Sequence, residues 1–199
     1  TTGNSTATFA IGTITATSAS SVSASIRVTA TPTLTLANSN TFTIPAPPPA
    51  NDLCSGAQVI PATGPFPYLT TVVDNTAAGT VGDPTPTCQI TFGHSVWYTI
   101  TPTVTGTWIF STCSSETATT ISDDVMSLFS GSCGTLTDVT CVDDNGSSCT
   151  GALASISATL TAGVTYYIMV SGYSINTGNI QIKVTSPPLS VPVATSATG

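Results

Sequence analysis

The sequence predicts an all-β protein: a disulfide-braced two-sheet β-sandwich, of jelly-roll or immunoglobulin-like kind, with an extended N-terminal β-strand arm. β-branched and aromatic residues dominate its apolar stretches, whereas Glu, Lys, Arg, Gln and Met, which favour helices, are scarce. Glycine and proline recur at a spacing typical of short strands joined by turns. The six cysteines are an even number and indicate three disulfides.

Residues 1–44 are the first expected element, the N-terminal β-strand arm. From Ser21 to Leu36 every even position is apolar, and every odd position is Ser, Thr or Arg27. This period of two predicts a strand with one buried face, which over this length would span about 53 Å. The earlier segment 8–14 could pair with it. The residues expected to contact a neighbouring copy are Val22, Ala24, Ile26, Val28, Leu34 and Leu36.

An arm of this size cannot bury an apolar face against itself, so it must dock on something else. Three placements are open: on a neighbouring copy, on its own downstream domain, or on an upstream domain of which it is a remnant. The proline-rich linker at residues 45–50 is a stiff spacer and favours the neighbouring copy. In this placement the arm resembles the donor strand of extracellular filament subunits.

Residues 51–186 are expected to form the β-sandwich domain, followed by a C-terminal tail at residues 187–199. Apolar runs between turn signals predict strands at 57–60, 68–73, 95–101, 106–111, 124–130, 138–142, 154–160, 165–170 and 179–185. Most of the aromatic residues fall inside these strands, which favours core packing over a sugar-binding platform. These aromatic residues are Trp97, Tyr98, Trp108, Tyr166 and Tyr167.

The cysteine spacing suggests a disulfide scheme. One pair flanks a hairpin-sized turn, a second would tie the start of the domain to its next segment, and the third follows by elimination. The expected pairs are Cys133 with Cys141, Cys54 with Cys88, and Cys113 with Cys149. Such bridges place the protein outside the reducing cytosol, in an extracellular or cell-surface location.

Four of the nine acidic residues fall in two short clusters at the ends of expected strands. These acids and a neighbouring amide are Asp123, Asp124, Asp143, Asp144 and Asn145. Like charges repel, and the chain has only two cations, so calcium with its oxygen ligands would stabilise the clusters. A solvated acidic turn is the alternative, and paired catalytic carboxylates are a third.

Charge and motif content exclude several function classes. Two basic residues against nine acidic ones cannot neutralise a phosphate backbone, so nucleic acid is not an expected partner. No apolar run is long enough to insert in a membrane. His94 is the single histidine, and no G-x-S-x-G sequence accompanies it, so the protein is not expected to be an enzyme.

Several segments of the domain together resemble the bacterial pre-peptidase C-terminal family of secreted β-sandwich modules. They are residues 51–54, 95–100, 106–113, 124–133, 141–145 and 160–170. The resemblance covers residues 51–186 and leaves the arm uncovered. It implies a jelly-roll-like sandwich that often binds calcium and serves secreted enzymes or surface proteins.

The sequence therefore predicts an extracellular structural protein, a subunit of a surface filament or pilus-like homopolymer assembled by β-strand addition between copies. A secreted adhesin or carbohydrate-binding module of a larger surface protein is the alternative. Glycans are further candidate partners. N-glycosylation sequons begin at Asn4 and Asn145, and the Ser/Thr-rich arm could carry O-linked sugar, so a glycoprotein is also expected.

Overall fold

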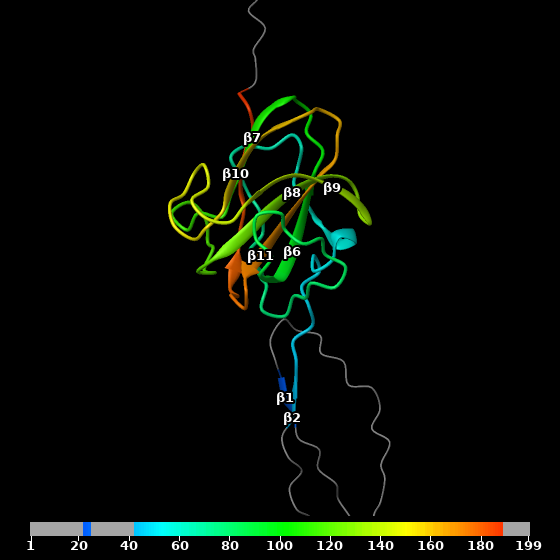
Figure 1. Cartoon of the computed structure of the whole chain (residues 1–199), viewed down its shortest axis with the longest axis vertical. Helices are drawn as coiled ribbons and strands as arrows, with labels where there is room; N and C mark the ends of the chain where they lie inside the picture. Colours follow the sequence, from blue (N-terminus) through cyan, green and yellow to red (C-terminus); the bar gives the residue numbers. More distant parts are fainter. Residues whose placement is uncertain (1–21, 25–41, 189–199) are drawn as a thin grey trace, which may run out of the picture. The chain divides into compact units, whose positions relative to one another are not determined.

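The computed structural model describes residues 22–24 and 42–188, which form two units divided between Pro47 and Pro48 (Figure 1). In the first unit, β1 (Val22–Ala24) pairs antiparallel with β2 (Phe42–Ile44). Most of the strand expected from Ser21 to Leu36 lies outside the described residues. So do four of the expected contact residues, Ile26, Val28, Leu34 and Leu36, together with segment 8–14 and most of the tail.

The second unit is built almost entirely of strands, and the described residues contain no α-helix. Its elements are the 3₁₀ turn η1 (Cys54–Gly56), β3 (Gln58–Val59), β4 (Tyr68–Leu69), β5 (Val73–Asp74), β6 (Phe92–Ile100), β7 (Gly106–Ser111), β8 (Asp124–Ser132), β9 (Thr135–Val142), β10 (Ser155–Leu160), β11 (Tyr166–Tyr173), β12 (Asn179–Ile180) and β13 (Lys183–Thr185). The expected all-β class is confirmed.

Two sheets form the sandwich. One has the strand order β10-β7-β13-β4, and the other has the order β3-β6-β11-β8-β9. All pairs within them are antiparallel except β3 with β6. In Figure 1, β6, β11 and β8 lie together at the centre of the domain, while β7 and β10 lie side by side. A separate two-stranded pair joins β5 to β12.

The main core lies between the two sheets and takes side chains from both. Trp108 and Phe110 of β7 and Ile156 of β10 pack with Tyr98 of β6 and Leu128 of β8, all essentially without solvent exposure. Four of the five aromatic residues expected to be structural are buried, and Tyr167 is partly buried. The core-packing interpretation of these aromatic residues is therefore confirmed.

A second, smaller cluster covers the other face of the five-stranded sheet. Trp97, Phe129 and Met169 are buried there, and Cys54 and Ala57 at η1 pack against them. Because both faces of this sheet are covered, its central strands are buried almost without alternation, as in β8. The segments over this face also carry two of the disulfides.

The structure contains three disulfides, and one expected pair is correct. Cys113 bonds to Cys149 as expected. The other two expected pairs, Cys133 with Cys141 and Cys54 with Cys88, are wrong. The observed bonds are Cys54 to Cys133 and Cys88 to Cys141. The turn between β8 and β9 closes through backbone pairing and hydrogen bonds between Ser132 and Thr135, so Cys133 and Cys141 are left to anchor the segments that cross the outer face.

Two expected strands are each broken in the middle. Segment 68–73 divides into β4 and β5, and segment 179–185 divides into β12 and β13, so each contributes to two sheets. At the break, Thr70 N–H donates to Ile182 O (3.0 Å), and Ile182 N–H donates to the Thr70 hydroxyl (2.9 Å). The Thr70 side chain therefore replaces a backbone partner where the chain changes sheet.

Candidate functional site

The two acidic segments meet where the β8–β9 hairpin opens. Asp123 immediately precedes β8, and Asp143 and Asp144 immediately follow β9. Because these strands are antiparallel, with Met126 opposite Val142, the start of one lies beside the end of the other. One carboxylate oxygen from each of these aspartates lies within 4.8 Å of the other two. The sequence placed these residues in two separate clusters at strand ends, and the pairing of β8 with β9 brings them together.

The structure gives Asp124 a different role from its neighbours. It is fully buried, and its Oδ1 accepts a 2.7 Å hydrogen bond from the Ala154 N–H, while its own N–H donates to Ala152 O (3.0 Å). Burial, reinforced by the Asp123 and Asp143 charges, raises its pKa from 3.8 to about 7, although the Ala154 N–H favours the charged form. Asp124 therefore anchors the loop of residues 143–154, outside the three-aspartate cluster.

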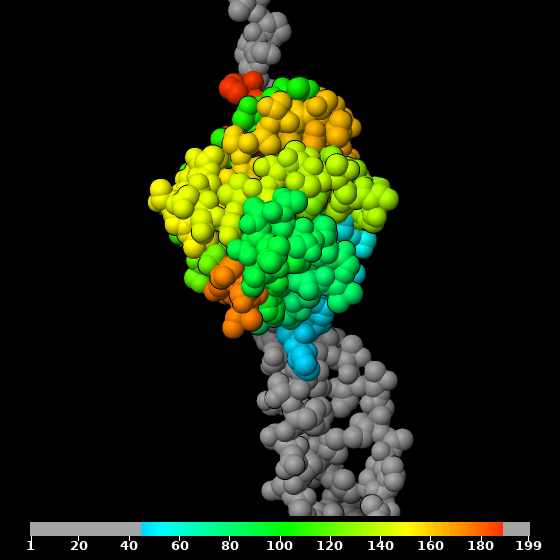
Figure 2. All heavy atoms as spheres, viewed as in Figure 1, coloured from blue at the N-terminus to red at the C-terminus, as the bar shows by residue number. Residues whose placement is uncertain are grey.

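Asn145 also serves this loop. Its backbone φ is +50°, in the left-handed region that asparagine tolerates better than most residues. Its Oδ1 accepts a hydrogen bond from the Gly151 N–H (3.0 Å), and its N–H donates to Gly151 O (2.9 Å). The expected ligand amide is thus used to close the loop, which projects in yellow from one side of the domain in Figure 2.

Asp143 has one oxygen bound and one without a partner. Its Oδ2 accepts a hydrogen bond from Gln89 Nε2 (2.9 Å), whereas its Oδ1 is shielded from solvent and has no hydrogen-bond partner. Sequence reasoning missed Gln89, which reaches the cluster because the adjacent Cys88 is bonded to Cys141. Burial, then the charges of Asp144 and Asp143, raise the pKa of Asp123.

The cluster has the chemistry of a hard-cation site. Three carboxylates carry a formal charge of −3, and within the described residues no basic side chain pairs with them. Lys183 is instead bound to Glu116 at 2.7 Å. Calcium prefers carboxylate oxygens, so the unpartnered Oδ1 of Asp143 fits a cation ligand.

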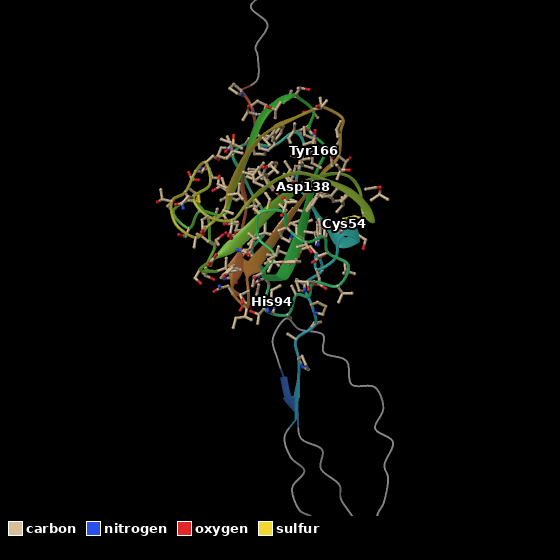
Figure 3. All side chains as sticks on the ribbon, viewed as in Figure 1. Cys54, His94, Asp138 and Tyr166 are labelled. Carbon is tan, nitrogen blue, oxygen red and sulfur yellow. A yellow bond between two sulfur atoms is a disulfide. The ribbon has the colours of Figure 1, made fainter. Side chains whose placement is uncertain are left out.

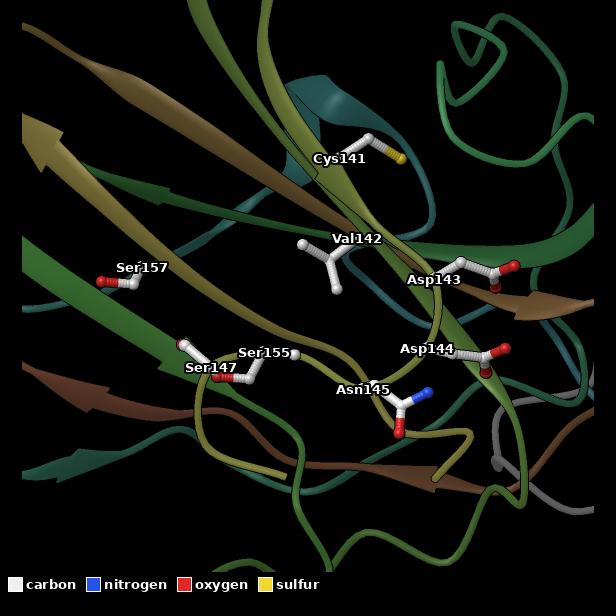
Figure 4. Close-up of a pocket in the computed structure, with 9 residues that line it drawn as sticks. Cys141, Val142, Asp143, Asp144, Asn145, Ser147, Ser155 and Ser157 are labelled. Atoms are coloured by element: carbon white, nitrogen blue, oxygen red, sulfur yellow. Dashed lines mark hydrogen bonds between the residues drawn. The ribbon is translucent and has the colours of Figure 1, made fainter. Parts of the chain in front are cut away.

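A groove of about 530 Å³ adjoins the acidic loop. It runs between the end of β9 and strand β10, and Figure 4 shows Val142 facing Ser155 and Ser157 across it. The Asp143 and Asp144 carboxylates project together to one side. A second hollow of similar size lies on the other side of the loop, beside the Cys113–Cys149 bond. Hydroxyl groups line much of both hollows.

His94 is a residue of β6. Its backbone φ is +56°, its carbonyl accepts a hydrogen bond from Asn75 Nδ2 (2.9 Å), and its buried Nδ1 has no partner. Figure 3 shows His94 and Asp138 in separate parts of the domain. Within the described residues, no nucleophile, histidine and acidic residue are joined by hydrogen bonds in the manner of a catalytic triad.

Comparison with known proteins adds no assignment to this geometry. No protein-family model matches the chain, and neither a curated protein nor a solved structure matches it significantly. Within the part of the chain that the structure describes, no helix is long and apolar enough to cross a membrane. Three disulfides are compatible with an extracellular or secreted protein.

Proposed function

We propose that this protein is an extracellular structural subunit that polymerises when the arm of one copy adds a strand to the next. The observation that carries the proposal is the unbroken alternation of apolar and polar residues from Ser21 to Leu36, joined to the sandwich by the linker at 45–50. Backbone hydrogen bonds would provide affinity, and apolar side chains such as Ile26 and Val28 would provide specificity.

The sandwich suits this role because the described core and disulfides lie within one unit of the chain. Buried residues from Ile60 to Val184 and all three disulfides belong to the second unit. A domain stabilised in this way has its own core and cross-links, so the arm is available to join another copy. Head-to-tail addition also gives an open fibre, because the contact does not close on itself.

The experiment compares full-length chains that differ on one face of the arm. The Ile26→Asp/Val28→Asp variant puts two charges on the apolar face, and the Ser21→Asp/Thr35→Asp control puts them on the polar face, at positions that do not flank Arg27. We expect filaments in negative stain for the natural chain and the control, and single domains for the apolar-face variant. Filaments in the apolar-face variant, or none in the natural chain, would contradict the proposal.

A second proposal concerns calcium. We propose that Asp123, Asp143 and Asp144 bind one calcium ion, because their oxygens converge and one buried oxygen of Asp143 has no partner. The resemblance of residues 51–186 to the pre-peptidase C-terminal family, whose members often bind calcium, agrees with this. The ion would offset the repulsion between the three charges and hold the 143–154 loop against the β8–β9 hairpin.

The calcium test uses calorimetry and thermal unfolding with the disulfides intact. We expect Ca²⁺ to bind the natural chain with one-site stoichiometry and EDTA to lower its melting temperature. The Asp144→Asn variant should lose both effects. The matched control, Asp138→Asn, removes an aspartate outside the cluster and should keep them. An unchanged melting temperature in EDTA would show that the cluster is a solvated turn.

A further inference from the structure

Strand β10 is an open edge of the four-stranded sheet. Among the described residues it pairs with β7 alone. The Ser147 N–H donates to Ser155 O (3.2 Å), so the Ser155 carbonyl points away from β7. Because backbone groups alternate along a strand, the N–H and C=O groups of Ser157 and Thr159 point the same way. Neither residue has a hydrogen-bond partner on that side within the described chain.

The other described edges are poorer acceptors for an added strand. Strands β3 and β4 are two residues long. Strand β9 is longer, but its register shifts beside Phe129 and it carries Asp138, two features that discourage edge pairing. Strand β10 has an unbroken register with β7 and contains no proline and no charged residue. Edges of this kind readily accept another strand.

The core is incompletely covered next to this edge. Val142 and Ala158 pack against the main core but remain partly exposed, and Val142 faces β10 across the groove. A strand added to β10 would place its inward side chains over this seam. It would also give the four-stranded sheet a fifth strand, matching the opposite sheet. Apolar inward residues would gain burial there, which favours an alternating donor.

The charges of the groove and of the arm are complementary. The loop beside the groove carries Asp143 and Asp144, close to Asp123. Residues 1–44 contain no acid, and Arg27 is their one basic residue. Calcium bound to the three aspartates would leave a formal charge of −3 + 2 = −1, so the cluster would still be negative and would still attract Arg27. Opposite charges favour association and help to fix its register.

We propose that residues 21–36 of a second copy add to the free edge of β10 and lie in the groove between β10 and β9, with Arg27 toward the Asp143–Asp144 rim. This rests on the proposed function and names the acceptor surface for it. The apolar face of the arm covers Val142 and Ala158, and its backbone pairs with Ser157 and Thr159. The polar face of the arm then lies on the outside of the new strand.

The first test blocks the edge in the full-length chain. The Ser157→Pro variant removes an N–H that has no partner in the domain, so the β10–β7 hydrogen bonds are retained. We expect it to raise the critical concentration for filament formation by about tenfold or more, whereas the Ser157→Ala control assembles normally. Thermal unfolding checks that both variants are folded.

The second test exchanges the charges and does not depend on proline being tolerated. Arg27→Glu and Asp144→Lys should each weaken assembly, and the double variant should recover it. Loss of calcium cannot produce this recovery, because the double variant also lacks the Asp144 carboxylate. Recovery therefore reports the contact between Arg27 of one copy and Asp144 of another.

The outcomes separate this inference from the proposed function. If the natural chain forms no filaments, strand addition itself is wrong. If filaments form and depend on the apolar face of the arm, but Ser157→Pro assembles normally and the charge exchange gives no recovery, the arm docks on another surface. Loss of assembly in folded Ser157→Pro, together with recovery in the double charge variant, supports β10 as the acceptor.

Discussion

The indole Nε1 of Trp97 donates a 2.9 Å hydrogen bond to Oδ1 of Asp83. Trp97 is buried on the outer face of the five-stranded sheet, and Asp83 belongs to the long segment that precedes β6. The bond therefore ties this irregular segment to the sheet. The second Asp83 oxygen, Oδ2, is shielded from solvent and has no partner.

This arrangement predicts a pH-dependent stability. Burial raises the pKa of Asp83 above its usual 3.8, and the Asp52 charge adds to this, against the hydrogen bond from Trp97. The native state thus keeps the proton to higher pH than the unfolded state. The contribution of Asp83 to stability is therefore greatest at low pH and falls as pH rises from about 3.8 through the raised value.

The measurement is the melting temperature of the natural chain minus that of Asp83→Asn, followed from pH 3 to pH 8. The asparagine can still accept the Trp97 hydrogen bond but does not ionise. We expect the difference to fall as the pH rises and then to level off. A difference that is constant, or that grows with pH, would contradict the assigned burial of Asp83.

The disulfide between Cys54 and Cys133 closes a separation of 79 residues and holds η1 against the outer face. Replacing both cysteines with alanine should lower the free energy of unfolding by about 4 kcal/mol, because the unfolded chain regains the freedom that the bridge removes. Denaturant titration measures this loss. Peptide mapping of the natural chain without reduction provides the control. Recovery of a Cys133–Cys141 peptide from it would contradict the observed connectivity.

Asn75 links three segments through its buried side chain. Its Nδ2 donates to His94 O (2.9 Å), and its Oδ1 accepts from the Gly178 N–H (2.8 Å). The Asn75→Ala variant leaves both partners without a hydrogen bond and should lose about 3 kcal/mol of stability. In the Asn176→Ala control the two lost bonds, to Tyr173 O and from the Ser122 hydroxyl, are exposed to solvent, so the cost should stay below about 1 kcal/mol. Equal losses would show that Asn75 is not the link.

Gly146 packs directly against the start of β10. A Cβ at this position would overlap the backbone N and O of Ser155, and neither atom can move without disturbing the strand. We therefore expect Gly146→Ala to displace the 143–154 loop and to cost about 1–3 kcal/mol in unfolding free energy. The Ser148→Ala control changes an exposed residue of the same loop and should be nearly neutral. A neutral Gly146→Ala would show that the loop sits away from β10.

Local sequence patterns were sufficient to predict most of the strands. The expected strand 106–111 has the observed bounds of β7, and the expected strands around Trp97, Leu128, Ile156 and Ile168 differ from β6, β8, β10 and β11 only near their ends. These segments succeed because alternating or continuous apolar residues define a buried face within a few positions. The two broken strands could not be foreseen, because Thr70 acts through Ile182, a residue more than a hundred positions away.

The acidic site was predicted in part for a similar reason. The sequence placed Asp123, Asp143 and Asp144 at the ends of expected strands, but only the observed pairing of β8 with β9 brings the three together. The same reasoning could not separate Asp124 from Asp123. Their side chains point to opposite faces of the strand, and only the packing of the 143–154 loop shows which face is buried.

By itself, the sequence determined the all-β class, the number of disulfides, most strands of the two sheets and the positions of the two acidic segments. These features depend on composition and on short periodic patterns. The tertiary structure alone decided that Cys54 bonds to Cys133, that Gln89 reaches Asp143 and that β10 is an edge strand among the described residues. Each of these depends on which segments cross a sheet, and that order is set by packing between residues far apart in the chain.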